Sequence, residues 1–347
     1  LLDLNTANVE DAMRLVVDAV TGCRFEVTDP ASEEVVLTKI LQVLLSCMRS
    51  EASVVLSNQH VCTIVTTCFR IVQQATAKGE LLQRMAAHTM RELVRCVFSH
   101  LPKAGNVDQA LVDGNRSMKS EMGGLDIDYN FLARQLNNGN ANSEYDQLPA
   151  IGLGAGAIDE DGAGDGKEAQ PYHLPLMTDP YGIPCMVEIF HFLCSLLNGL
   201  DDFGIGPGSN ALAIDEDAPL FALGLINSAI ELGGASFVRH SRLLNLIQDE
   251  LFRNLILFGL SPSPLILSMV CSVVLNLYHH LRMELKLQIE AFFCCVILRL
   301  AQSSNGASYR QQEVAMEALV DFCRQKTFMV EMYANFDCDI TCSNVFE

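Results

Sequence analysis

Residues 264–302, PLILSMVCSVVLNLYHHLRMELKLQIEAFFCCVILRLAQ, decide the fold class of this chain. Their apolar residues recur with the spacing of buried helices, which predicts two helices, over about 264–282 and 284–302. The most apolar run, Pro264 to Tyr278, is about 15 residues long and includes polar Ser268, Ser272 and Asn276. A helix needs about 20 apolar residues to span a bilayer. The run from Pro264 to Tyr278 is therefore interpreted as one buried helix of an all-α protein.

The helical pattern extends in both directions from this stretch. Asn8 and the pair Asp29-Pro30 are typical of helix starts, and Pro102 follows the end of an N-terminal helix. Further helices are predicted after Asn8, after Asp29, from Pro184 onward, and over about 58–75, 80–100, 219–232, 240–258 and 309–325. Such consecutive helices have too many apolar faces for one bundle, which predicts an armadillo- or HEAT-like superhelix of stacked helical hairpins. No fixed-period repeat is visible, so this prediction rests on the number and burial of the helices.

One long stretch lacks the helical pattern. Residues 103–178 hold 11 of the 23 glycines and carry 12 acidic against 5 basic residues, a net charge of −7. Such a segment buries too little apolar surface to offset its ordering entropy, so we predict a long disordered linker. The chain is thereby divided into a helical region over 1–102, the acidic glycine-rich linker over 103–178 and a second helical region over 179–347.

The composition restricts the environment and the partners. The 42 acidic and 23 basic residues give a formal charge of −19, so nucleic acid is not expected as a partner. The 13 cysteines, Cys47 and Cys271 among them, lie in apolar helical stretches without disulfide-scaffold spacing, which predicts reduced core residues in a cytoplasmic protein. Residues 1–5 contain neither an initiator Met nor a basic region followed by an apolar run. We therefore expect a piece of a longer protein, without a signal peptide.

Three short motifs suggest chemistry but lack the required context. The stretch GLGAGA over 152–157 fits a dinucleotide-binding fingerprint, but no strand precedes it and no helix follows it. Asp126 begins a sequence like a calcium loop, but Phe131 stands where glycine is needed. Glu188 and His191 have the spacing of a di-iron ligand pair, but no second pair is apparent. No catalytic, cofactor-binding or metal-binding residue is predicted, and we expect this chain not to be an enzyme.

The C-terminal residues carry a family resemblance. Asn335, Phe336, Asp337, Cys338 and Asp339 form the sequence Asn-Phe-Asp-Cys-Asp at the end of a short predicted helix. This resembles the box found upstream of the catalytic exchange domain in large Arf guanine-nucleotide exchange factors, and all five positions match it. We call these five residues the box.

Other segments extend the resemblance over nearly the whole chain apart from the linker. Residues 221–234, 247–255 and 315–323 are similar to the homology region upstream of the exchange domain in that family. Residues 1–102 are similar to part of its dimerisation and cyclophilin-binding region. The chain most resembles the Golgi brefeldin-A-resistance exchange factors, with those of animals expected to be nearest.

The resemblance implies a non-catalytic regulatory segment. The expected properties are homodimerisation, contact with the protein's own exchange domain, Arf and Rab small GTPases as partners, and peripheral association with Golgi and ER-Golgi intermediate membranes. Because Asn and Asp side chains bond neighbouring backbone amides, the box is predicted to form either a structural corner leading into a helix at 342–346 or a docking edge.

Two functions of other classes stay open at this stage. A helical-repeat adaptor or carrier protein is also acidic and superhelical, although the box argues against it. A membrane-surface-binding module requires a basic amphipathic face, which a charge of −19 makes hard to assemble.

Overall fold

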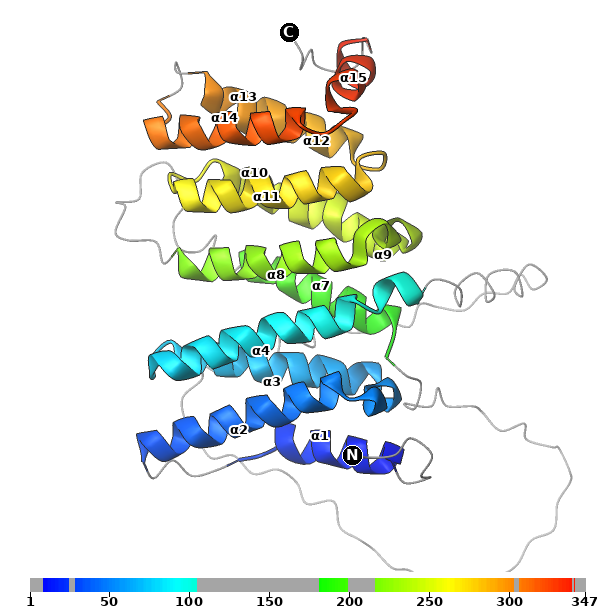
Figure 1. Ribbon diagram of the computed structural model, residues 1–347, viewed down its shortest axis with the longest axis vertical. Coiled ribbons are helices and arrows are strands. Elements are labelled where there is room, and N and C mark those ends of the chain that lie inside the picture. Colours follow the sequence, from blue (N-terminus) through cyan, green and yellow to red (C-terminus); the bar gives the residue numbers. More distant parts are fainter. Residues whose placement is uncertain are drawn as a thin grey trace, which may run out of the picture.

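The computed structural model describes residues 9–24, 29–104, 181–198, 216–302, 306–338 and 340. Within these ranges the chain consists of helices and turns, without a β-strand. The helices stack in one elongated array, with α1 (Val9–Thr21) and α2 (Pro30–Arg49) at one end and α14 (Tyr309–Cys323) and α15 (Phe328–Met332) at the other (Figure 1). The predicted all-α superhelix of stacked helical hairpins is confirmed. The predicted linker lies outside the described residues from position 105 onward.

The helices form two columns. The first column contains α2, α4 (Glu80–Phe98), α8 (Asp217–Gly233), α11 (Pro264–Leu281) and α14, and each packs on the next. The second column contains α1, α3 (Asn58–Ala75), α7 (Ile183–Asn198) and two composite rods. The rods are α9 (Ser241–Asn245), η5 (Leu246–Leu251) and α10 (Phe252–Gly259), then α12 (Lys286–Phe292), η6 (Phe293–Ile297) and α13 (Leu298–Ala301). Short 3₁₀ helices lie at the turns: η1 (Glu51–Val55), η2 (Leu101–Lys103) and η4 (Gly234–Arg239). A π-helical turn, η8 (Tyr333–Asp337), continues α15.

The helix starts follow from local side-chain chemistry. The Asp29 carboxylate accepts a hydrogen bond from the backbone amide of Ser32 at 3.1 Å, and Pro30 is the first helical residue of α2. Because the first amides of a helix have no partner within it, this cap stabilises α2, by about 1 kcal/mol. Ser308 and Gln311 form a reciprocal capping box at the start of α14. The helix start predicted at Asp29-Pro30 is confirmed.

The helices predicted over 240–258 and 284–302 differ from the structure in one respect. Each contains a π-helical turn, η5 in the first and η6 in the second. A π turn places one extra residue in the helix, with hydrogen bonds from i to i+5. The apolar spacing in the sequence does not mark this single inserted residue, so the sequence predicted uninterrupted α-helices.

The apolar core runs without a break from α1 to α15. α3 packs on α7 and α4 packs on α8, so the helices before and after the predicted linker share one core. By length and composition alone, Asp217–Arg239 and Pro264–Leu281 are apolar enough to cross a membrane. In the structure α11 lies between α8 and α14 and buries Val270, Val274 and Leu277, as expected from the sequence for a core helix.

Candidate functional site

The two halves of the chain meet in a region held together by hydrogen bonds, buried thiols and aromatic rings. We call it the junction: the contacts of α3, α4 and η2 with α7, α8 and η4. The Asn58 side-chain oxygen, on α3, accepts hydrogen bonds from the amides of Gly182 at 2.9 Å and Cys185 at 3.2 Å. A residue of one half thereby caps the first helix of the other half. The Tyr181 amide also bonds the Leu56 carbonyl at 2.8 Å, and the Tyr181 hydroxyl bonds His100.

A buried thiol pair lies beside this cap. The sulfur atoms of Cys62 and Cys185 are 3.8 Å apart, and the Cys62 thiol lies 3.1 Å from the Glu188 carboxylate. The hydrogen bond with Cys185, together with burial, raises the pKa of the Cys62 thiol far above its usual range. A thiol held protonated is a poor nucleophile and a poor metal ligand. The pair therefore acts as packing between α3 and α7, as predicted for cysteines in apolar stretches. The prediction was wrong for four other cysteines, Cys23, Cys295, Cys323 and Cys338, which are exposed.

Aromatic rings fill the centre of the junction. The Phe237 ring of η4 stacks on Phe98 of α4 with centroids 6.2 Å apart and meets Phe190 of α7 at 5.2 Å. All three side chains are fully buried. A Cβ atom added to Gly233 would lie 2.4 Å from the Phe237 ring and 2.7 Å from Leu101 of η2, so only glycine fits there without movement. The segment 221–234, singled out by resemblance, thus includes a glycine that packs tightly beside Leu101 of the first half.

Glu188 and His191 do not converge on a common site. Glu188 faces Cys62 on α3, whereas His191 approaches Glu250 of η5 at 3.6 Å. Glu250 also accepts a hydrogen bond from Asn198 at 2.7 Å. Among the described residues no group of three or more His, Cys, Asp and Glu side chains could hold a metal ion. The pair is structural in this fold, and its two members bond to different neighbouring helices.

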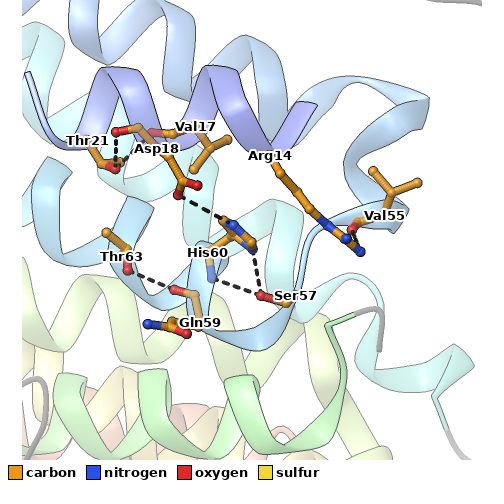
Figure 2. A network of polar contacts seen from close by, with 9 residues as sticks. All are labelled: Arg14, Val17, Asp18, Thr21, Val55, Ser57, Gln59, His60 and Thr63. Carbon is orange, nitrogen blue, oxygen red and sulfur yellow. Dashed lines mark hydrogen bonds and ion pairs between the residues drawn. The ribbon is translucent and has the colours of Figure 1, made fainter. Parts of the chain in front are cut away.

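Near the N-terminal end, the side chains of Ser57, His60 and Asp18 contact one another in that order (Figure 2). This arrangement was not predicted from the sequence. His60 Nδ1 lies 2.6 Å from Ser57 Oγ, and His60 Nε2 lies 3.5 Å from Asp18 of α1. In hydrolases this order of residues activates the serine. Here Ser57 Oγ caps α3 by accepting a hydrogen bond from the His60 amide, and its side chain is buried. The arrangement fastens α1 to α3, together with the bond from Arg14 to the Val55 carbonyl.

The box lies at the opposite end of the array. Asn335, Phe336 and Asp337 are the last three residues of η8, which directly follows α15. Phe336 is buried, and the Lys286 ammonium lies 5.8 Å from its ring centroid. Asn335 and Cys338 are exposed. The short helix predicted to end in the box is present, whereas Asp339 and the helix predicted at 342–346 lie outside the described residues.

The carboxylate of Glu331 fastens α15 to the C-terminal end of α11. Glu331 accepts hydrogen bonds from the Tyr278 hydroxyl at 2.6 Å and from Arg282 Nε at 3.0 Å. Burial, which raises the pKa of Glu331, is outweighed by hydrogen bonds from Tyr278, Thr327 and Arg282, and the pKa is lowered. The ionised carboxylate thus supports the position of the box.

These features define a class of protein: a helical solenoid whose described polar clusters connect helices to one another. Comparisons then give the family. Residues 182–345 match the family described as Mon2/Sec7/BIG1-like, HUS domain. The whole chain is 68% identical to the ARF guanine-nucleotide exchange factor GNOM and 99% of it is 57% identical to GNL1, both of Arabidopsis thaliana. The chain belongs to the family of large Arf guanine-nucleotide exchange factors of the brefeldin-A-resistance type.

Two details qualify this placement. The chain spans about a quarter of the length of these relatives, 24% of GNOM and 24% of GNL1. The Golgi-specific brefeldin A-resistance factor 1 homolog of Caenorhabditis elegans is 26% identical over the whole chain, far less than the plant proteins. The expectation that the animal factors are nearest was therefore wrong. The box and the apolar helix patterns resembled the family closely enough to indicate it. They do not distinguish its plant members from its animal members.

Proposed function

We propose that this chain is a non-catalytic regulatory and dimerisation segment of a large Arf guanine-nucleotide exchange factor that acts in vesicle traffic between the endoplasmic reticulum and the Golgi. It mediates homodimerisation, contacts the exchange domain of the same polypeptide and recruits the protein to the cytoplasmic surface of Golgi and ER-Golgi intermediate membranes. Arf and Rab small GTPases are the partners of the whole protein.

The junction is the observation that supports this proposal best. Three contacts join the halves. Asn58 accepts hydrogen bonds from two backbone amides, Leu101 packs beside Gly233, and Phe98 stacks on Phe237. The described helices therefore form one continuous solenoid. Through such a continuous packed core, the binding of a partner at one end can change the affinity for a second partner at the other end. The relatives are named as ARF guanine-nucleotide exchange factors, which supports an Arf-directed role for the protein to which the segment belongs.

Nucleotide release from Arf tests the regulatory part of the proposal. The 347-residue chain is added to Arf loaded with fluorescent GDP, with full-length Arabidopsis GNOM as the positive control. We expect spontaneous release with the chain alone and accelerated release with GNOM. Acceleration by the chain alone would show that it is itself an exchange factor and would contradict the proposal.

Mass and membrane binding test the remaining parts. Light scattering during gel filtration should give twice the monomer mass of 38.1 kDa, and a monomer at micromolar concentration would remove dimerisation from the proposal. In flotation with protein-free anionic vesicles the chain should stay at the bottom of the gradient, because its charge of −19 opposes binding. Addition of membrane-bound Arf or Rab should carry it upward. Flotation without a protein partner would favour a direct membrane-surface module instead.

A further inference from the structure

The outward side of α14 is an apolar surface at the end of the first column. Ala315, Ala318 and Phe322 of α14 are buried on its inner side, where it packs on α11. On the outer side Tyr309, Met316 and Val320 are 78%, 49% and 48% exposed. These three lie at i, i+7 and i+11 and share one face of the helix. We call Tyr309, Met316, Glu317 and Val320 the α14 face.

Elsewhere in the first column, each apolar helix surface of this kind is covered by the next helix. α11, which precedes α14, is covered by α8 on one side and by α14 on the other. The helices that lie inside the column are covered in the same way, by a further helix at each step. An apolar stripe repeated at helical spacing is the surface on which another helix packs. The α14 face therefore has the pattern of a helix-binding surface.

Acidic residues accompany this stripe. Glu313, Glu317 and Asp321 follow one another at intervals of four residues along the helix. The first pairs with Arg310 at 3.2 Å and the last with Arg324 at 2.7 Å. Glu317, between them, forms no ion pair with any described residue. A cation placed beside Met316 and Val320 would meet the Glu317 carboxylate.

We propose that the α14 face binds an amphipathic helix of a partner protein that carries Lys or Arg beside its apolar stripe. The negative charge of Glu317 distinguishes between the possible ligands of this face. An anionic bilayer and the segment 103–178, with its net charge of −7, would be repelled by Glu317. A second copy packed antiparallel would have its two-fold axis near Met316, the middle of α14, and would place Glu317 beside its own copy. A basic helix satisfies both the apolar stripe and the carboxylate.

Two synthetic peptides test this proposal. Both are 18-residue helices with the same leucine stripe, one with lysines beside the stripe and the other with glutamates. Anisotropy of the labelled peptides is measured with the whole 347-residue chain at about 0.15 M salt, where long-range attraction is screened. We expect the lysine peptide to bind at least about tenfold more tightly than the glutamate peptide. Met316→Asp should weaken binding of the lysine peptide about tenfold or more, because it replaces a half-exposed apolar side chain in the middle of the stripe with a charged carboxylate that would have to be buried against leucines.

The chain supplies a matched control, because Met283-Glu284 repeats the dipeptide Met316-Glu317 at an exposed turn. Glu317→Lys should weaken the lysine peptide about three- to tenfold, while Glu284→Lys, with the same change in net charge, should leave binding within about twofold. Met283→Asp should likewise have no effect. Equal binding of the two peptides, or equal effects at both sites, would overturn the proposal.

Folding and self-association are checked on the same variants. Circular dichroism reports whether Met316→Asp keeps its helix content, and Val320→Asn serves as a second, milder variant with the same expected loss of binding. Light scattering reports the mass. If Met316→Asp and Val320→Asn convert a dimer into a monomer, a second copy occupies the α14 face and the proposal is wrong. An unchanged mass together with lost peptide binding supports it.

Discussion

The junction and the C-terminal end use similar apolar residues in opposite ways. At the junction Phe98, Phe190 and Phe237 are fully buried, whereas Tyr309, Met316 and Val320 at the end of the array are exposed. The sequence places an acidic glycine-rich segment between α4 and α7, yet those halves share one core. The comparison shows that a break in helical pattern along the chain need not be a break in packing, and that an intact pattern can still end in an uncovered surface.

The largest expected effect tests whether the junction is core. Phe237→Ala removes a fully buried ring that contacts Phe98 and Phe190, and should lower the free energy of unfolding by about 3–5 kcal/mol. Tyr309→Ala is the control at the exposed end and should change it by less than about 0.5 kcal/mol. Urea unfolding followed by circular dichroism measures both. Equal effects would mean that the two halves are not held together by this contact.

Two glycines in α8 give a second test of the junction, because alanine substitutions at them should change the stability in opposite directions. Gly233→Ala should cost about 1–3 kcal/mol, because its Cβ would lie within 3 Å of Phe237 and Leu101. At Gly224, on the same helix, the new Cβ of Gly224→Ala would meet no atom within 4 Å other than the backbone of its own helix, so this variant should instead stabilise by about 0.5–1 kcal/mol. Thermal unfolding should move in opposite directions for the two variants. A gain in stability at both positions would contradict the close contact at the junction.

A smaller effect concerns pH at the C-terminal end. The pKa of Glu331 is lowered in the folded chain, so its contribution to stability is present above the ordinary glutamate pKa of about 4.3. That contribution is lost as the pH falls through the lower, folded value. We expect Glu331→Gln to cost about 1 kcal/mol at neutral pH, through the bonds with Tyr278 and Arg282. The difference should shrink below pH 4, and a constant difference from pH 7 to pH 3 would show that ionisation is irrelevant.

Much of the helical framework could be predicted from the sequence, because apolar spacing and caps such as Asp29-Pro30 act within a few residues. The junction could not. The bonds from Asn58 to Gly182 and Cys185 join residues more than 120 positions apart, and neither a polar side chain nor a glycine indicates its distant partner. The π turns η5 and η6 were missed for a related reason, since one inserted residue hardly alters an apolar pattern. The box was found by resemblance, and its physical role stays a prediction.

The smallest expected effect separates the two roles considered for the box. If the Asn335 side chain formed a structural corner by capping backbone amides, Asn335→Ala would cost about 1 kcal/mol. In the structure Asn335 is exposed, and the turn closes through the backbone bond from the Cys338 amide to the Tyr333 carbonyl at 3.0 Å. Burial of Phe336 anchors the same turn. We therefore expect Asn335→Ala to change the free energy of unfolding by less than about 0.5 kcal/mol, and Phe336→Ala by about 2–4 kcal/mol. A loss above 1 kcal/mol for Asn335→Ala, measured by urea unfolding, would favour the corner. A neutral result would leave Asn335 available to a docking partner.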